Sequence, residues 1–540
     1  MKAISNSGSF TDFLNSSYIY IDKTETIYKL FTMQKKVFIS RPRRFGKSLT
    51  LDTIGTLFEK GVDPYFKNTW IYDKWSEPSL PVLRIDFLKF SVTDINEFKS
   101  QFVLCVSNFA RKHNVTGYLE NNDPGTSLNS LLENLSDEEK RIIILIDEYD
   151  CQLTANINNK DLYEMYREII RSLYAIIEAN SRAIRFLAVT GVTRLKDTTI
   201  FSVGSDIDDI SNESAYSQLI GFTREEIKTF YIDYLKLAAS YENKVTAENV
   251  TEEQIENMLD KLAENYDGYC FDENGIKKVF STWSVNKFFQ AIAKNGYVKF
   301  GDYWYDNGGI PSILANHIKS HELNASEYLE KNNLITVPIE TYTNPTSLLD
   351  IDQNVLMCQT GYLTLKRSLS NTPTAVLGIP NHEVYRALNS LLALKIFETI
   401  DINNKDGYSI FDIGTVDEII SLLNTALNSV SYEKFPINNE AHLVSIVQSY
   451  MYGARQNVIA QQNTSKGRAD LAVETSTRRI IFEFKYAVNE SDTKTKLIEA
   501  IKQIKSRDYG NILPAKKLIR IAAVFNAENS VRAITEYQQV

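Results

Sequence analysis

The first part of the chain alternates short apolar runs with longer stretches of helical periodicity. The runs are apolar at nearly every position, which is typical of strands buried on both faces of a sheet. Strands that alternate with helices predict an α/β fold, a parallel sheet with helices on both faces. The expected strands are Lys36–Ser40, Pro81–Phe87, Arg141–Ile146 and Arg185–Thr190, and the expected helices include Leu49–Lys60 and Asp161–Asn180.

The pattern changes three times after this part. Residues 223–330 are helical and aromatic-rich, which predicts a helical lid, and residues 331–430 are mixed, which predicts a linker or winged-helix-like region. Residues 431–540 read as helix, two strands, helix and strand, which predicts an α/β restriction-endonuclease-like domain. With residues 1–222 as the first domain, the 540-residue chain has four regions, as expected of a chain too long for one core. The expected elements of the last region are strands Leu471–Val473, Arg479–Phe484 and Lys517–Phe525 and helix Lys494–Arg507.

Composition narrows the kinds of site that we expect. The four cysteines, Cys105, Cys151, Cys270 and Cys358, are far apart and the five histidines are scattered, so any metal should be bound by carboxylates. No window approaches the roughly 20 apolar residues of a membrane span, and the N-terminal residues lack the apolar run of a signal peptide. We therefore expect a cytoplasmic protein without a membrane partner.

The charge of the chain is unevenly distributed. The net charge is −9, but residues 455–520 hold fourteen Lys/Arg and seven Asp/Glu, a net +7 that leaves −16 on the rest. A basic segment on an acidic protein indicates a polyanionic partner, and a solvated helix face explains it equally well.

A phosphate-binding loop is expected directly after the first strand. Residues 40–48 read SRPRRFGKS, and they end an apolar strand and open a helix. In that context backbone N–H groups would bind phosphates, Lys47 would reach the β- and γ-phosphates and Ser48 would bind Mg²⁺. Arg41 stands where the general pattern has its first glycine. The residues expected to bind the nucleotide here are Arg43, Arg44, Phe45, Gly46, Lys47, Ser48 and Leu49.

Two further strands end in polar residues that suit the same site. The run IIILIDEYD ends in Asp147, which would bind Mg²⁺ through water, and Glu148, which would polarise the attacking water. Alone, such a run also fits a buried strand that ends in a solvated turn. The next strand ends in Thr190, placed to sense the γ-phosphate, and is followed by Arg194, which is either a phosphate or subunit contact or only a loop cation.

These segments resemble the AAA-ATPase-like family, a P-loop group related to AAA+ and STAND proteins. The resemblance rests on RPRRFGKSLTL, IDEYD and VTGVTRLKDTTIFS, followed by NYDGYCFD, YWYDNGGIPSIL and QTGYLTLK. In that family the loop reads RPRRFGKS, so Arg41 is no departure. The resemblance implies ATP binding and hydrolysis. Aromatic residues between Tyr266 and Phe271 invite a base-stacking interpretation, but aromatics at this spacing more often belong to a core.

A group of carboxylates and one lysine marks the last region. Asp470 begins one expected strand, and Glu483 and Lys485 leave the same face of the next because they lie two residues apart. If the strands pair antiparallel, the three side chains converge, two carboxylates can bind one Mg²⁺ or Mn²⁺, and the lysine can orient a water. Glu440 would add a carboxylate from a preceding helix. A charged surface hairpin is the structural alternative.

The D…ExK pattern resembles the PD-(D/E)XK nuclease superfamily. The segments GRADLAVE, IIFEFKYA and AIKQIKSRDY are similar to the nuclease-like domain found behind AAA-ATPase-like domains. The resemblance implies that Glu440, Asp470, Glu483, Lys485 and Gln503 form the site. We expect an ATPase with a metal-dependent nuclease acting on DNA, in defence or mobile-element biology by analogy, with a homo-oligomer left open. The alternative is a nucleotide-controlled binding or signalling module whose nuclease fold is inactive.

Overall fold

The protein divides into two compact units. The first unit comprises Met1–Glu322 and Leu334–Val384, and the second comprises Leu323–Asn333 and Tyr385–Val540. The boundary at 384/385 falls inside the region 331–430, and the division into four domains stays a prediction. The computed structural model describes residues 1–14, 18–135, 141–194, 206–306, 313–314, 327–328, 331–345, 347–397, 405–454, 456–460, 463–464, 467–507 and 516–540.

The first unit is built on a five-stranded parallel sheet. Its strand order is β2-β3-β4-β1-β5, and all of its strand pairs are parallel. This confirms the α/β fold expected from the alternating pattern. The strands are β1 (Lys36–Ser40), β2 (Val82–Asp86), β3 (Ile142–Asp147), β4 (Ile184–Gly191) and β5 (Asp208–Asp209).

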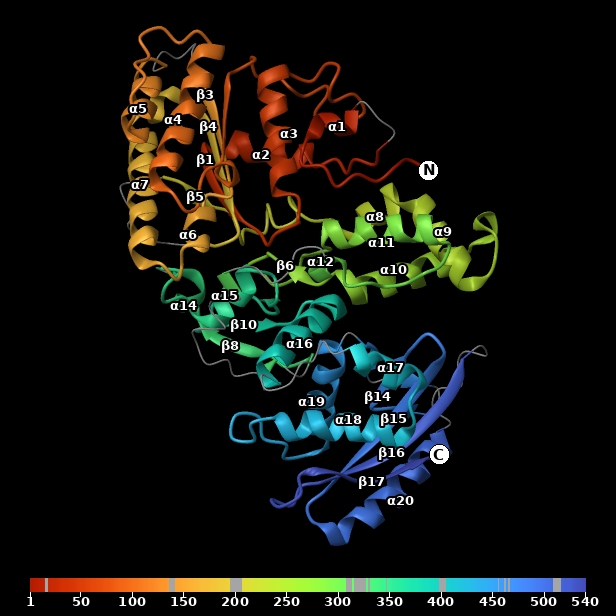
Figure 1. Ribbon diagram of the computed structural model, residues 1–540. Coiled ribbons are helices and arrows are strands. Elements are labelled where there is room, and N and C mark those ends of the chain that lie inside the picture. The colour runs from red at the N-terminus through yellow and green to blue at the C-terminus, as the bar shows by residue number, and fades with distance from the viewer. Residues whose placement is uncertain are drawn as a thin grey trace. The chain divides into compact units, whose positions relative to one another are not determined.

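Helices cover both faces of this sheet. Figure 1 shows α4, α5 and α7 on one side of the strands and α2 and α3 on the other. The buried residues of α7 include Tyr163, Tyr166, Ile170, Leu173 and Ile177, a spacing of three and four that places one apolar stripe against its neighbours. The helices are α1 (Phe10–Leu14), α2 (Thr24–Met33), α3 (Lys47–Lys60), α4 (Ile95–Lys112), α5 (Pro124–Glu133), α6 (Cys151–Ala155) and α7 (Lys160–Ala179).

A helical region with its own core follows in the same unit. Buried residues of α8 to α11, among them Leu235, Leu259 and Phe288, pack together with Ile4 and Ile19 from the N-terminal segment. Tyr266 and Tyr269 are also buried, so these two aromatics belong to the core. The helices are α8 (Arg224–Phe230), α9 (Ile232–Asn243), α10 (Glu252–Tyr266), α11 (Thr282–Asn295) and α12 (Tyr303–Asp306).

Short strands complete the first unit. A hairpin, β6 (Tyr269–Cys270) with β7 (Lys278–Val279), precedes a small antiparallel sheet of order β8-β10-β9. Part of the YWYDNGGIPSIL segment and of VTGVTRLKDTTIFS lies outside the described residues. The remaining elements are β8 (Ile335–Pro338), β9 (Thr364–Leu365), β10 (Thr374–Gly378), α14 (Ile339–Thr343) and α15 (Gln353–Gln359).

The second unit carries a mixed sheet of order β11-β14-β15-β16-β17. Only β15 and β16 pair parallel, and the other pairs are antiparallel. Helix α20 packs on β15 and β16, and Figure 1 shows α18 and α19 on the other side. Helix α16 (His382–Ile396) contains the boundary between the units. The elements that follow it are α17 (Lys405–Ile413), α18 (Val416–Ser429), α19 (Glu440–Gly453), α20 (Glu490–Arg507), β11 (Asn457–Ala460), β12 (Asn463–Thr464), β13 (Gly467–Arg468), β14 (Leu471–Glu474), β15 (Arg478–Ala487), β16 (Lys517–Asn526) and β17 (Ala533–Gln539).

Gly268 lies where its own segment and the segment around Pro380 approach each other closely in the first unit. Its φ is +94°, and a Cβ placed on it would lie 2.3 Å from the carbonyl oxygen of Pro380. Gly296 is a matched case, because its φ is +74° but a Cβ would meet nothing within 4 Å.

Among the helices that the structure describes, none combines the length and apolar character needed to cross a bilayer.

We therefore expect Gly268→Ala to destabilise the first unit more than Gly296→Ala. Both substitutions force an L-residue into left-handed backbone at a cost of about 1–2 kcal/mol, and only Gly268→Ala adds overpacking of about 1–3 kcal/mol. Calorimetric melting of the two full-length variants measures the difference. Equal shifts of the melting transition would contradict the assigned contact.

Candidate functional site

The loop between β1 and α3 has the backbone of a tight strand-to-helix turn. Gly46 precedes the first residue of α3 with φ +105°, and Arg44 also has a positive φ, +70°. A Cβ on Gly46 would meet nothing within 4 Å, so glycine is favoured here for its backbone conformation and not for space. The turn directs the N-terminus of the fourteen-residue helix α3 toward the loop.

Lys47 lies inside this loop. Its side chain is 3% exposed, and its Nζ donates to the carbonyl oxygens of Arg41 at 3.1 Å and Pro42 at 3.4 Å. The Oε1 atom of Glu148 lies 3.2 Å from the same ammonium. Two predicted site residues, one from the loop and one from the end of β3, are therefore in contact.

The Asp147 carboxylate accepts hydrogen bonds from hydroxyl groups of two neighbouring elements, α3 and β4. Its Oδ2 accepts a hydrogen bond from Ser48 Oγ at 2.6 Å, and its Oδ1 accepts one from Thr190 Oγ1. Ile146 pairs with Val189 in the parallel register of β3 and β4, so both strands end at the same edge, where ligands of such sheets bind. The structure thus brings together Ser48, Asp147 and Thr190, as the sequence predicted for a nucleotide site.

The residues after Asp147 have an unusual conformation. Glu148 has φ +52° although it is not glycine, and such backbone occurs mostly where the surrounding contacts fix it. Two residues on, the buried Asp150 accepts hydrogen bonds from Val192 N at 3.3 Å and Thr193 N at 2.7 Å. Burial, followed by the Glu148 carboxylate, raises the pKa of Asp150.

Asp150 was not among the predicted site residues. It fixes the turn after β4 to the end of β3, and the only signal for it in the sequence was the third acidic residue of IDEYD.

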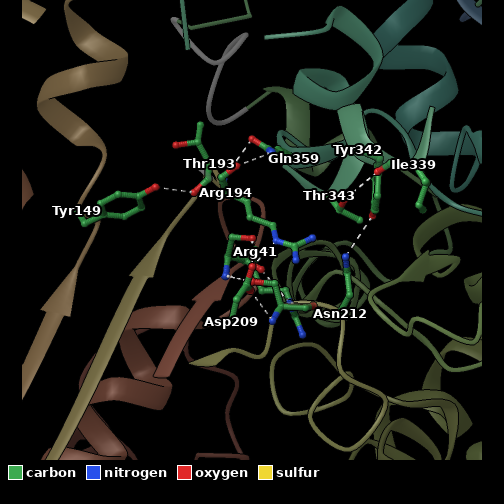
Figure 2. A network of polar contacts seen from close by, with 12 residues as sticks. Arg41, Tyr149, Thr193, Arg194, Asp209, Asn212, Ile339, Tyr342, Thr343 and Gln359 are labelled. Carbon is green, nitrogen blue, oxygen red and sulfur yellow. Dashed lines mark hydrogen bonds and ion pairs between the residues drawn. The ribbon is translucent and has the colours of Figure 1, made fainter. Parts of the chain in front are cut away.

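Arg194 is held by partners within its own unit. Its guanidinium forms an ion pair with Asp209, and its backbone N–H and carbonyl oxygen each lie 3.1 Å from the Gln359 amide. Figure 2 shows Arg194 between Gln359 and Asp209, with Tyr149 donating to Thr193 O beside it. Arg194 is therefore not an isolated loop cation, and its contact with phosphate stays a prediction.

The other predicted loop residues differ in where their side chains lie. Arg43 is exposed and Leu49 is half-buried in the first turn of α3. Arg44 donates to Trp304 O at 2.8 Å, and Phe45 packs edge-on against Tyr269 with ring centroids 4.7 Å apart. The Arg44 and Phe45 side chains thus contact the helical region and the β6 hairpin, so any phosphate contact from these two residues would come from backbone N–H groups.

The oxygen ligands at this edge fit a magnesium nucleotide. Ser48 and Asp147 offer a hydroxyl and a carboxylate, the hard oxygen ligands that Mg²⁺ prefers when phosphates and waters complete its shell. Within the described ranges no cluster of three or more His, Cys, Asp or Glu side chains could hold a metal alone. An ion would therefore need oxygens from the nucleotide or from water.

The second unit brings the predicted D…ExK residues to neighbouring strands. β14 and β15 pair antiparallel with Leu471 opposite Phe482, so the same register places Asp470 opposite Glu483, on one face of the sheet. Asp470 Oδ2 accepts a hydrogen bond from Phe484 N at 2.8 Å. The hairpin that the site required is thus present.

Lys485 bridges two of the carboxylates. Its Nζ lies 3.0 Å from Glu483 Oε1 and 3.1 Å from Glu440 Oε1, and Glu440 is the first residue of α19. Helix α19 and strand β15 therefore meet at this lysine.

Glu483 is the most strongly perturbed group of this site. It is 0% exposed, and its Oε2 has no hydrogen-bond partner within the described part of the chain. Burial, with the Asp470 carboxylate second, raises the pKa of Glu483 to about 7, while Lys485 opposes the rise. An unpartnered buried carboxylate oxygen beside a second carboxylate fits a divalent cation, which would offset both effects.

Gln503 lies on α20, which covers the face that bears Glu483. Ile481, two residues before Glu483 on β15, packs with Ala500 and Ile504 of α20. Gln503 is half-buried next to these positions, and its part in the site stays a prediction.

Two regions of the chain match known families. Residues 6–201 match the family described as Predicted AAA-ATPase, and residues 438–534 match the PD-(D/E)XK nuclease superfamily. "Uncharacterized protein in vnfD 5'region" of Azotobacter chroococcum mcd 1 is 26% identical over 511 residues, which cover 92% of this chain and 90% of that protein. The crystal structure of Cdc6p from Pyrobaculum aerophilum aligns with 67% of this chain and 88% of its own at 13% identity, with a TM-score of only 0.21.

The family matches coincide with the two sites described above. The first match contains Lys47, Ser48, Asp147, Glu148 and Thr190, and the second contains the residues around Glu483. The chain therefore combines an N-terminal region that matches the AAA-ATPase family model with a C-terminal region that matches the PD-(D/E)XK nuclease superfamily model.

Proposed function

We propose that this protein binds and hydrolyses ATP in its first unit and cuts DNA in a metal-dependent reaction in its second. The observation that carries the proposal is the state of Glu483, a fully buried carboxylate beside Asp470 and Lys485, one of whose oxygens has no hydrogen-bond partner among the residues that the structure describes. A hairpin that only displayed charges on a surface would leave this carboxylate in water. The family matches support the coarser conclusion that the chain has an ATPase-like and a nuclease-like region.

The first site contains the groups that phosphoryl transfer requires. Lys47 would exchange its loop carbonyl partners for phosphate oxygens, and Ser48 with Asp147 would bind Mg²⁺. Glu148 lies next to Lys47 and would orient and polarise the attacking water. Thr190 shares the Asp147 carboxylate with Ser48, so it can respond to a change at the γ-phosphate.

The second site contains two carboxylates and a lysine in contact. Asp470 and Glu483 would hold Mg²⁺ or Mn²⁺ together with waters, and the metal would activate water and neutralise the scissile phosphate. No third His, Cys, Asp or Glu joins them in one metal-binding group among the described residues, so the predicted role of Glu440 as a further ligand would require it to move from its place beside Lys485. Lys485 would hold the water or the developing negative charge in place. Its ammonium is already fixed between Glu440 and Glu483, so it needs little reorganisation.

The surroundings of this site suit a polyanion. Residues 455–520 have a net charge of +7, and Lys494, Lys502 and Lys505 of α20 are exposed. Lysines spread over a helix surface bind a phosphate backbone without reading its sequence. We propose DNA as the substrate, and RNA is the competing outcome of the cleavage assay.

We expect Lys47→Ala to weaken ATP binding by about 10-fold or more while the protein stays folded. Charge-assisted hydrogen bonds from the ammonium to phosphate contribute about 1.5–3 kcal/mol, and the substitution removes them. Calorimetric titration with Mg-ATP measures the loss, and Glu148→Gln is the comparison because it should keep binding and slow hydrolysis. Undiminished binding by Lys47→Ala would exclude this loop as the phosphate site.

We expect Asp470→Ala to reduce plasmid cleavage by at least about 100-fold, the scale on which preorganised electrostatic groups act. The assay contains Mg²⁺ or Mn²⁺ and compares DNA with RNA. Asp492→Ala is the matched control, because Asp492 is an exposed carboxylate in the first turn of α20. If the wild type cuts neither polymer but binds DNA, the protein is a nucleotide-controlled binding module.

We further expect ATP to change the rate of cleavage by the wild type and not by Lys47→Ala. The two sites lie in different units, so coupling requires that ATP favour a conformation or assembly in which the second site is more accessible. Cleavage rates of both proteins with and without ATP, at equal concentration, measure this. Identical rates in all four conditions would mean that ATP does not control the nuclease.

A further inference from the structure

Arg41 is a buried arginine at the start of the phosphate-binding loop. It is 1% exposed and stands where the general loop pattern has glycine. Its Nη1 donates to Ser40 O at 2.8 Å and to Ser211 O at 2.7 Å, and its Nη2 donates to Tyr216 O at 3.4 Å. The guanidinium carbon lies 4.1 Å from the centroid of the Phe271 ring.

Backbone atoms of Arg41 contact two parts of the proposed phosphate site, the end of β4 and Lys47. Its N–H donates to Gly191 O at 3.2 Å, at the end of β4. Its carbonyl oxygen accepts a hydrogen bond from Lys47 Nζ at 3.1 Å. Figure 2 shows the Arg41 side chain beside Asp209 and Asn212, close to Arg194. One residue therefore connects the turn after β5, the end of β4 and the lysine of the loop.

Fold stability alone does not account for an arginine at this position. Burial lowers the pKa of Arg41 to about 9, against the pull of Asp209, and Asp209 is itself paired with Arg194. Within the described residues Arg41 Nε has no hydrogen-bond partner. Buried charged groups can often be replaced by apolar side chains of similar volume without loss of stability.

We propose that Arg41 is a positioning residue for ATP, whose side chain fixes the loop so that Lys47 is held ready for phosphate. This inference rests on the proposed ATP binding of the first unit. The side chain is anchored on Ser211, Tyr216 and Phe271, behind the loop, so the loop backbone at Arg41, against which Lys47 lies, cannot drift. ATP then binds to a loop that needs no ordering, which lowers the entropic cost of binding.

The contacts require a guanidinium and not merely a positive charge. Its central carbon lies over the Phe271 ring while its two terminal nitrogens donate to carbonyl oxygens of distant residues, Ser211 and Tyr216. A lysine has one compact ammonium, so it cannot make the same stacked and forked arrangement.

The test compares Arg41→Met and Arg41→Lys with the wild type in full-length protein. We expect Arg41→Met to keep the wild-type melting temperature within a few degrees, because it refills the volume without a buried charge. Both variants should bind Mg-ATP about 10-fold or more weakly by calorimetry, with KM raised and kcat at saturating ATP within about 3-fold. Arg185→Met is the control, because Arg185 is a half-buried arginine near the other end of β4, paired with Glu77.

Several outcomes would overturn the proposal. Wild-type affinity in both Arg41 variants would show that the loop needs no anchor, and restored affinity in Arg41→Lys would show that charge alone suffices. An equal loss in Arg185→Met would show a general effect of lost stability. If Arg41→Met does not fold, Phe271→Leu decides, because it removes the stacked ring and should also raise the Kd for ATP. Absence of ATP binding by the wild type would instead defeat the proposed function itself.

Discussion

The parallel pairing of β1, β3 and β4 is the constraint on which the first site depends. Parallel strands end at one edge, so residues more than 140 positions apart in sequence, Ser48 and Thr190, both reach Asp147. The order β2-β3-β4-β1-β5 places β4 between β3 and β1. The last residue of β4 thereby accepts a hydrogen bond from the Arg41 N–H, and the turn after β4 donates to the Asp150 carboxylate. The site is thus a consequence of strand order and not of one motif alone.

The second site depends on a different balance, between burial and charge. Removing Glu483 from water raises the pKa of its carboxyl group, and the opposite Asp470 raises it further. The Lys485 ammonium offsets part of this cost at 3.0 Å, but Glu483 Oε2 finds no hydrogen-bond partner in the described part of the chain. A buried carboxylate whose desolvation is only partly offset is stabilised by a nearby cation. This is the physical reason why we link the geometry of the second site to metal-dependent chemistry.

Two buried ionic groups of the first unit lie where loops and turns are joined to the sheet. Arg41 and Asp150 are both about 1% exposed, and both bond to backbone atoms of loops and turns. Each group costs desolvation and gains hydrogen bonds of fixed direction. They are therefore better understood as devices that fix loop geometry than as sources of fold stability.

The sequence by itself determined the α/β class, the strand β1 with its bounds, the strand–loop–helix unit around Lys47 and the carboxylate–lysine pattern of the second unit, because periodicity and short-range spacing are local properties. It missed the edge strands β5 and β17 and gave no role to Arg41, Asp150 or Asp209. Their roles depend on partners far away in sequence, such as Ser211 for Arg41 and Thr193 for Asp150. Only the tertiary structure decided these pairings, because strand order and burial fix which distant groups meet and which of them lose contact with water.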